Sequence, residues 1–475
     1  MHYQYPQFVH VNFPARLSHR VLRVSLATVA LLVAGVFAAS ADTDNLPPGY
    51  SIKVISSNVS VSEITQMAFR PGDLTHVYAV RSQQSKVSRY DYDPVTGQLS
   101  NATDAAVNPD NRGIIGLGFH GTNLYTSLAY GSSDDRLSRW FDSNDDGLFE
   151  SRHDFVYNIP TGNHNANQIQ ILGDSLYVGI GAAGRKGDPS EENLYTMTVA
   201  RVADLTQVIT TGVGSNYKGP VNYLASPTEW TNTAPTDGLL RYFASGFRNP
   251  FGIAFDPEGA LWVTVNGNSD AGFLSDDFIY KNVQAGDEGE FPPPEFGYSK
   301  HIYGNPITNF INLGLSPSPG GLDFILDGPD AGLAIVGELG ATRNNSLGRD
   351  LLLVDTDTGS YEQIYQFSTD SRDYGVSDVV RDPFGRFLVS DYGHNAVWLL
   401  TPPLPEPELS VTISGLHVEL RWPLTGVEYT LQESSTPENP DSWMPSTVVP
   451  DITTNGILAS VTTTNDSRFY RLKKD

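Results

Sequence analysis

Short apolar segments that follow a glycine or aspartate turn recur six times along the chain. They read HVYAV, NLYTSLAY, SLYVGI, ALWVTV, LAIVGE and RFLVSD, and they surround Tyr78, Tyr125, Tyr177, Trp262, Ile335 and Leu388. Successive segments are 47, 52, 85, 73 and 53 residues apart. A repeat of this length is typical of blades of short strands arranged in a ring. The sequence therefore predicts an all-β chain whose main domain is a six-bladed β-propeller, with loops in the longer intervals.

The composition agrees with short strands joined by tight turns, since 44 of the 475 residues are Gly and 31 are Pro. A single blade cannot bury both of its faces, so only ring closure completes such a core. The chain contains no cysteine. Core burial, with calcium as a further stabiliser, must then hold the fold together without disulfides.

The first 41 residues have the layout of a secretory signal peptide. They contain Arg16, Arg20 and Arg23 and no acid, and an apolar run from residue 24 to residue 39 ends in Ala39-Ser40-Ala41. The run is short and rich in Ala and Gly, which favours a cleaved signal over an uncleaved anchor. We therefore expect a secreted or periplasmic protein with no membrane span in the mature chain.

Residues 402–408 are rich in proline and predict a stiff linker between two domains. Residues 42–401 then form the propeller, and residues 409–475 form a small β-sandwich of short alternating strands. We expect Trp422, Tyr429, Trp443 and Phe469 to form the core of this sandwich. The alternative is that these aromatic side chains form a carbohydrate platform.

Two strings place polar side chains directly ahead of apolar strands. NHNANQI (Asn163–Ile169) carries His164, and GFRNPFGIAF (Gly246–Phe255) carries Arg248. A histidine accepts a proton near neutral pH, and an arginine holds a developing oxyanion, which together suit the oxidation of an alcohol. The alternative is a structural histidine and a structural Arg-Asn-Pro turn.

The order of these motifs resembles the glucose/sorbosone dehydrogenase family of soluble quinoprotein propellers. RGIIGLGFH (Arg112–His120), the His164 string, the Arg248 string and a final GRFLVSD strand follow one another over most of residues 50–400. The resemblance implies a six-bladed propeller that uses pyrroloquinoline quinone (PQQ) and calcium. It also implies that His164 is the general base and that Arg248 stabilises the quinone oxygen as charge develops there.

The resemblance further implies which residues surround the cofactor. Asn111, Asn163 and Asn249 match positions that line the quinone, together with Arg248. The backbone carbonyls of Gly267 and Asn268 match calcium ligands, because a hard cation prefers such oxygens. The chain departs from the family at Gly181-Ala182-Ala183-Gly184, where many relatives have Gly-Asp-Gln-Gly.

A second candidate calcium site lies in the string FDSNDDGLFE. Asp142, Asn144 and Asp146 alternate ahead of Gly147, as in the first half of a calcium loop. Position twelve of the loop is His153 instead of the closing Glu of an EF-hand. A calcium loop and a plain Asx-rich turn therefore both remain open.

The net charge of −24 excludes nucleic acid as a favoured partner, because such a chain repels phosphate backbones. The expected function is oxidation of a small sugar or related alcohol by hydride transfer to PQQ with calcium assistance, followed by transfer to an external electron acceptor. The alternative is a non-catalytic exported propeller that binds a glycan or a surface protein. His164 and Arg248 favour the first, and Ala182-Ala183 favour the second.

Overall fold

A computed structural model describes residues 45–129, 135–159, 162, 164–182, 197–206, 240–267, 276–288, 305–315, 317–340, 348–367, 374–414, 417–462 and 468–474. The predicted signal peptide lies outside these residues. Within them, no helix has the length and apolar character needed to cross a membrane.

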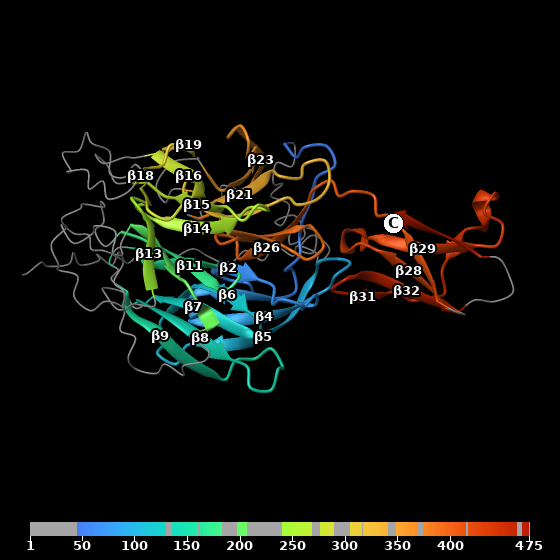
Figure 1. The fold of residues 1–475 in the computed structure, drawn as a ribbon, viewed down its shortest axis with the longest axis horizontal. Coiled ribbons are helices and arrows are strands. Elements are labelled where there is room, and N and C mark those ends of the chain that lie inside the picture. The colour runs from blue at the N-terminus through green and yellow to red at the C-terminus, as the bar shows by residue number, and fades with distance from the viewer. Residues whose placement is uncertain are drawn as a thin grey trace, which may run out of the picture. The chain divides into compact units, whose positions relative to one another are not determined.

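The six-bladed propeller predicted from the sequence is confirmed (Figure 1). Six sheets each contain four consecutive strands that pair antiparallel, and each such set of four is one blade. Each of the six apolar segments seen in the sequence is the second strand of a blade. Blades 1 to 3 consist, from the inner strand outward, of β2 (Ile64–Ala68), β3 (His76–Arg81), β4 (Lys86–Tyr92) and β5 (Leu99–Val107); β6 (Gly113–His120), β7 (Asn123–Ala129), β8 (Asp135–Phe141) and β9 (Ser151–Ile159); and β10 (Ala166–Leu172), β11 (Ser175–Ile180), β12 (Thr198–Val202) and β13 (Leu240–Ser245).

Blades 4 to 6 have the same plan. Their strands are β14 (Pro250–Phe255), β15 (Leu261–Val265), β16 (Asp276–Val283) and β19 (Phe310–Leu315); β20 (Pro319–Phe324), β21 (Ala334–Glu338), β22 (Asp350–Val354) and β23 (Tyr361–Gln366); and β24 (Val376–Arg381), β25 (Phe387–Asp391), β26 (Ala396–Thr401) and β1 (Ser51–Val54). The short strands β17 (Asp287–Glu288) and β18 (Asn305–Pro306) extend blade 3, and a 3-10 turn, η1 (Ser82–Gln84), follows β3.

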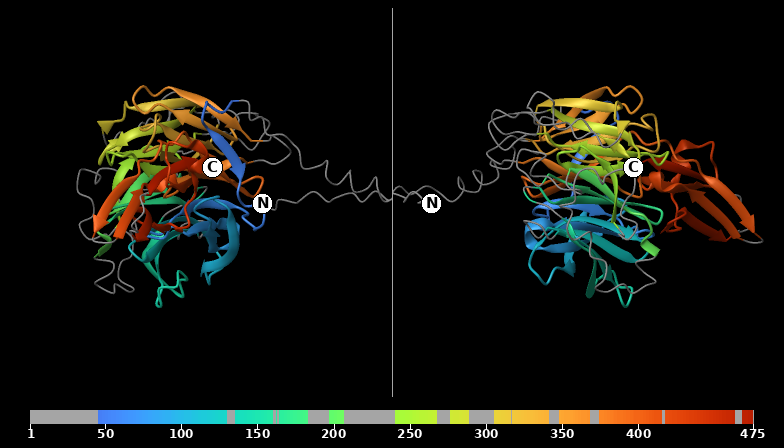
Figure 2. Two further views of the ribbon diagram at one scale, coloured as in Figure 1. Left: turned by 90° about the vertical axis from the view of Figure 1, so that its right-hand side faces the viewer. Right: turned by 60° about the vertical axis from the view of Figure 1, so that its left-hand side comes forward.

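Strand β1 closes the ring. It precedes blade 1 in the chain but pairs with β26 as the outer strand of blade 6, with Ser51 opposite Thr401 and Val54 opposite Trp398. The inner strands contact one another in the order β2, β6, β10, β14, β20, β24 and back to β2. The sheets accordingly follow one another around the ring in colour order in the left view of Figure 2. Each inner strand is the edge strand of its own sheet, and closure surrounds this edge with the neighbouring inner strands.

All six pairs of inner and second strands contain a register shift near the first residues of the inner strand. Such a bulge turns one carbonyl out of its own ladder, and a buried carbonyl then needs another donor. The neighbouring blade supplies it in several places: Thr65 Oγ1 donates to the Ile115 carbonyl at 2.7 Å, and Ser127 Oγ donates to that of Asn167 at 2.7 Å. The bulges thus couple adjacent blades at one end of the ring.

Polar side chains at the bulges make hydrogen bonds across the ring. Gln168 of blade 3 donates through Nε2 to the Thr65 carbonyl of blade 1 at 2.8 Å and to Asp378 Oδ1 of blade 6 at 3.0 Å. Neither blade is adjacent to blade 3, so this side chain crosses the axis. Gln66 lies close by and bonds both backbone groups of Ile169. The inner strands are therefore linked across the axis as well as around it.

The C-terminal residues form the expected small sandwich. One sheet contains β27 (Ser410–Ser414), β28 (His417–Trp422), β32 (Gly456–Thr462) and β31 (Asp451–Thr453), and the other contains β30 (Met444–Pro445), β29 (Tyr429–Ser434) and β33 (Phe469–Lys474). The 3-10 turns η4 (Leu424–Gly426) and η5 (Pro440–Ser442) lie in its loops.

The expected aromatic core of the sandwich is only partly correct. Trp422 is buried among Leu420, Leu431 and Ile457, whereas the side chain of Phe469 is 44% exposed. Phe469 pairs with Ser434, three residues from the buried Leu431, and this odd spacing places it on the opposite face of β29 and β33. Tyr429 and Trp443 are half-buried, with the Arg471 guanidinium over the Trp443 ring at 4.3 Å.

The apolar cluster around Trp422 continues into blade 6, since it also contains Phe384 and Leu388. The domain boundary at residues 402–408 remains a prediction. Leu420 and Trp422 of the sandwich are buried in one cluster with propeller side chains. Apolar contacts therefore join the sandwich to the propeller in addition to the connecting chain.

Candidate functional site

The candidate site lies at the end of the ring where the inner strands begin, which we call the upper face. Each blade has four antiparallel strands, so the chain returns to this end before every new inner strand. The register of the inner and second strands defines an equivalent entrance position in all six blades. In chain order it is occupied by Ser62, Arg112, His164, Arg248, Pro317 and Tyr374. Two residues expected from the sequence, His164 and Arg248, occupy equivalent places, and Asn111 precedes that of blade 2 by one residue.

Backbone hydrogen bonds bring His164 and Arg248 to neighbouring positions. The His164 amide donates to the Ala182 carbonyl at 3.1 Å, and the Ala182 amide donates to the Arg248 carbonyl at 2.7 Å. Residues 181 and 182, which follow β11, thus lie between the two strand entrances. Ala182 is fully buried there and contributes no polar side chain.

The electrostatics of this pair keep the histidine neutral. Burial, assisted by the positive charge of Arg248, lowers the pKa of His164 to about 3. Both effects disfavour the imidazolium form, the first through lost hydration and the second through like-charge repulsion. At neutral pH, His164 is therefore a neutral imidazole, the form that can accept a proton.

Arg248 is 6% exposed, and its guanidinium is held by a turn of the same blade. Nη1 donates to the Gly267 carbonyl at 2.5 Å, with the Asn266 carbonyl at 3.5 Å. The Asn266 amide in turn donates to the Asn249 carbonyl at 3.1 Å. Gly267, expected from the sequence to offer its carbonyl to calcium, thus offers it to a cationic side chain of the protein.

Asn249 joins the site through Asn167, which the sequence analysis did not single out. Asn167 Nδ2 donates to Asn249 Oδ1 and to the Pro250 carbonyl, both at 2.9 Å. The two amides are buried, so this bond fixes the orientation of the Asn249 side chain. Asn167 belongs to the bulge of β10, where sequence spacing alone gives no direction for its side chain.

Gly181 provides the space in which His164 and Asn249 meet. A Cβ atom at residue 181 would lie 2.3 Å from the His164 Cβ and 2.7 Å from Asn249 Oδ1. Both distances are below van der Waals contact, so the backbone of one strand entrance must shift to accept a side chain. Glycine at this position therefore permits the observed approach.

We expect Gly181→Ala to lower the free energy of unfolding by about 1–3 kcal/mol, as overpacking of a rigid site does. Gly118→Ala is the matched control, because its new Cβ would meet only the flexible side chains of Ile169 and Ile171 at 3.3–3.4 Å. Denaturant unfolding of both variants compares the two sites. Equal stability of Gly181→Ala and the wild type would contradict the close approach of His164 and Asn249.

Three buried acids also lie at the upper face and were missed by the sequence analysis. Burial raises the pKa of Asp277 to about 7, against the bonds from Ser318 and Gly267 and the charge of Arg248. Burial and the neighbouring Asp350 raise the pKa of Glu338 to about 10. Acids directly flanking apolar strand cores, as in SDDFIY and IVGE, were the available signal.

Asn111 is exposed and has a left-handed φ of 53°. Its amide donates to the Asn108 carbonyl at 3.1 Å, which closes a turn ahead of β6. The structure therefore places Asn111 in a turn ahead of β6, one residue before the position equivalent to that of His164. Asn163 and Asn268, also expected to line the site, lie outside the described residues.

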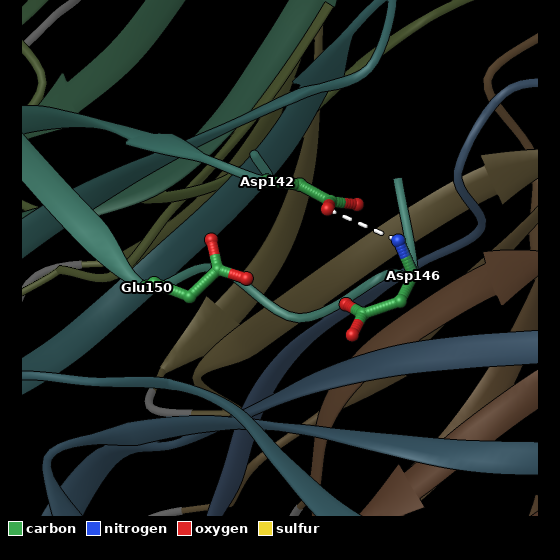
Figure 3. Close-up of side chains that lie close together, drawn as sticks. All are labelled: Asp142, Asp146 and Glu150. Carbon is green, nitrogen blue, oxygen red and sulfur yellow. Dashed lines mark hydrogen bonds between the residues drawn. The ribbon is translucent and has the colours of Figure 1, made fainter. Parts of the chain in front are cut away.

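The loop with Asp142, Asn144 and Asp146 lies at the opposite end of blade 2, after β8. Oxygens of Asp142, Asp146 and Glu150 lie within 4.8 Å of one another (Figure 3). The Asp146 and Gly147 amides donate to Asp142 at 3.1 and 2.8 Å, and Arg70 pairs with Asp142 at 3.3 Å. These bonds describe an Asx-rich turn, and calcium binding there stays a prediction.

The upper-face residues suit the removal of a proton from a bound hydroxyl. A neutral imidazole can accept the proton, and an adjacent guanidinium stabilises negative charge that develops nearby. The Nε atom of Arg349, which precedes β22, is also buried without a hydrogen-bond partner among the described residues. The site therefore has positive charge available for an anionic ligand.

Comparison with solved structures shows the same fold in sugar-oxidising proteins. The chain is similar to a calcium-containing structure of a Trichoderma reesei protein of Carbohydrate-Active Enzymes Family AA12, with 14% identity, a TM-score of 0.56, and 75% and 96% of the two chains covered. It is also similar to the PQQ domain of a pyranose dehydrogenase from Coprinopsis cinerea, with 13% identity, a TM-score of 0.53, and 75% and 96% covered.

A third similar structure is the PQQ-bound form of an aldose sugar dehydrogenase from Streptomyces coelicolor, with 16% identity, a TM-score of 0.52, and 75% and 99% covered. No protein-family model and no curated protein matches the sequence. The resemblance expected from the motifs is therefore confirmed at the level of the fold.

Proposed function

We propose that this protein is an oxidoreductase that oxidises a hydroxyl group of a sugar or a related alcohol, with PQQ as hydride acceptor and calcium as a second cofactor. The observation that carries the proposal is the juxtaposition of a neutral His164 with the Arg248 guanidinium, at the upper face of a fold shared with PQQ-containing sugar dehydrogenases. Fold alone does not imply activity, so the argument depends on these two side chains.

The described residues fit an anionic quinone. Arg248 supplies a positive charge, and the unpaired buried Nε of Arg349 supplies a second donor. The Asn249 side chain is already oriented by Asn167. When bound, the quinone would supply the hydride acceptor, and a calcium ion would polarise it. Asn111, Asn163, Arg248 and Asn249 are the proposed cofactor contacts, and the turn of Gly267 and Asn268 is the proposed calcium position.

His164 and Arg248 have separate roles in this proposal. His164 takes the hydroxyl proton of the substrate as its carbon gives up hydride, because a neutral imidazole can act as the base. Arg248 stabilises the negative charge that develops on the oxygen next to its guanidinium. The low pKa of His164 limits its strength as a base. Negative charge brought next to Arg248 offsets one of the two causes of that low value.

The alternative function is that of a non-catalytic exported propeller that binds a glycan or a surface protein. The buried Ala182, where many relatives of the family carry a polar residue, favours it. An external electron acceptor and export of the mature chain belong to the first proposal.

The test is reconstitution of the purified full chain with PQQ and calcium, separately and together, followed by dye-linked oxidation of a panel of aldoses. We expect reduction of the dye only when PQQ is present, and a higher rate with calcium. Absence of PQQ binding by fluorescence titration, together with absence of sugar oxidation, would overturn the proposal in favour of the binding function.

A further inference from the structure

Asp277 joins two blades through both of its carboxylate oxygens. Oδ1 accepts the Gly267 amide of blade 4, and Oδ2 accepts the Ser318 amide at the entrance of blade 5 at 2.6 Å. The residue is 1% exposed, and it stands at the beginning of β16 on the upper face. A buried carboxyl group that accepts hydrogen bonds from two backbone amides is rigidly held, and it also fixes the positions of the two amides.

The Gly267 amide belongs to the peptide group that also carries the Asn266 carbonyl. In a trans peptide these two groups point to opposite edges of one plane. Because the amide points to Asp277, the Asn266 carbonyl points to the other side, where Arg248 Nη1 lies 3.5 Å away. Asp277 therefore sets the orientation of the plane that faces the guanidinium.

The next carbonyl, that of Gly267 itself, makes the shorter bond to Arg248 Nη1 at 2.5 Å. A glycine backbone rotates freely about φ and ψ, so the direction of this carbonyl needs an external anchor. The adjacent amide bond to Asp277 is that anchor. A chain of contacts thus runs from Ser318 through Asp277 and Gly267 to Arg248.

We propose that Asp277 is the positioning residue of Arg248: it holds the Gly267 turn in the orientation that aims the guanidinium at the cofactor. This inference rests on the proposed function for the identity of the ligand, and on the contacts above for the role. Asp277 does not touch the ligand in this scheme. It acts only through the turn and the arginine.

The first test is a double-mutant cycle read by PQQ affinity. We expect Asp277→Asn to raise the dissociation constant about tenfold, since the amide side chain can no longer accept both N–H groups. In an Arg248→Ala background the same change should alter the constant less than twofold, because its effect passes through the arginine. Equal tenfold losses in both backgrounds would mean a general structural effect and would overturn the proposal.

Asp276→Asn is the matched control. It makes the same carboxyl-to-amide change at the neighbouring residue, which accepts a hydrogen bond from Asn312 Nδ2 at 2.7 Å and, within the described part of the chain, makes no bond to Gly267. We expect its PQQ affinity to remain within twofold of the wild type. Asp277→Ser, which retains one acceptor oxygen, replaces Asp277→Asn if the latter does not accumulate as folded protein.

The second test does not need the cofactor. Phenylglyoxal modification of Arg248, followed by peptide mass spectrometry and normalised to the exposed Arg421, reports how firmly the guanidinium is held. We expect several-fold faster modification in Asp277→Asn and no change in Asp276→Asn. Unchanged modification in Asp277→Asn would overturn the positioning role. Faster modification in a protein that binds no PQQ would support that role and refute only the proposed function.

Discussion

Replacement of His164 by alanine is expected to lower PQQ-dependent sugar oxidation by about 10²–10⁴-fold, the usual contribution of a positioned general base. PQQ affinity should change little, since the neutral imidazole contributes no charge to the binding of an anionic quinone. Arg248→Ala should weaken both, because in the proposed site the guanidinium contacts the cofactor before and during its reduction. Titration with PQQ and initial rates at saturating PQQ separate the two effects.

His120→Ala is the matched control for this pair of variants. His120 ends the inner strand of blade 2 at the far end of the ring and pairs with Asp174 at 2.8 Å. We expect its turnover and PQQ affinity to equal those of the wild type. Wild-type turnover in His164→Ala would remove the assignment of His164 as the base, whatever the behaviour of Arg248→Ala.

The folded protein is expected to lose stability as the pH rises from 6.5 to 9. Glu338 is buried beside Asp350, and its pKa is raised from 4.5 to about 10. An acid with a raised folded-state pKa keeps its proton in the native state, so its stabilising effect is complete below pH 4.5 and is lost as the pH rises toward the folded value. One such group changes the free energy of unfolding by about 1.4 kcal/mol per pH unit.

Asp378 extends the same trend to lower pH, since burial raises its pKa from 3.8 to about 7. Below pH 6.5, His164 acts in the opposite direction and makes stability rise with pH. Its pKa is lowered in the folded state, so the unfolded chain binds a proton that the native state does not. Asp277, whose pKa is raised to about 7, adds to the decline in the same range, so between pH 5 and 6.5 three acids outweigh the single histidine. Above pH 7, Asp277 and Asp378 no longer contribute, and the decline that remains there is due to Glu338.

Thermal midpoints measured at fixed scan rate and at half-unit pH intervals test this trend. Glu338→Gln should flatten the decline above pH 7, whereas Asp357→Asn, which changes an exposed acid, should leave it unaltered. A midpoint that is constant or rises from pH 6.5 to 9 would show that Glu338 ionises normally in the folded state.

The sequence was sufficient for the ring but not for the contacts that build the site. Apolar segments that follow a Gly or Asp turn identified the second strand of each blade, because these strands are buried on both faces and carry the strongest apolar signal. The strand-entrance positions of His164 and Arg248 followed from short local motifs.

The missed residues depend on distant partners. Asp277 is 41 residues from Ser318, and Gln168 is 210 residues from Asp378. Their roles arise from ring closure and from the bulges, which redirect side chains without any mark in local apolar spacing. Phe469 was misplaced for a related reason, since the face of an edge strand is set by its pairing register.

The position of the candidate site at one end of the ring has a kinetic consequence. Gln168 bridges blades 1, 3 and 6 through hydrogen bonds across the axis of the ring. Under the proposed function, the sugar and the electron acceptor would both react at the upper face, in alternation, and each would delay the other. Double-reciprocal plots of initial rate against sugar concentration, at several fixed acceptor concentrations, should be parallel lines. Excess of either reactant should slow turnover, because it then occupies the upper face when the other reactant must bind there.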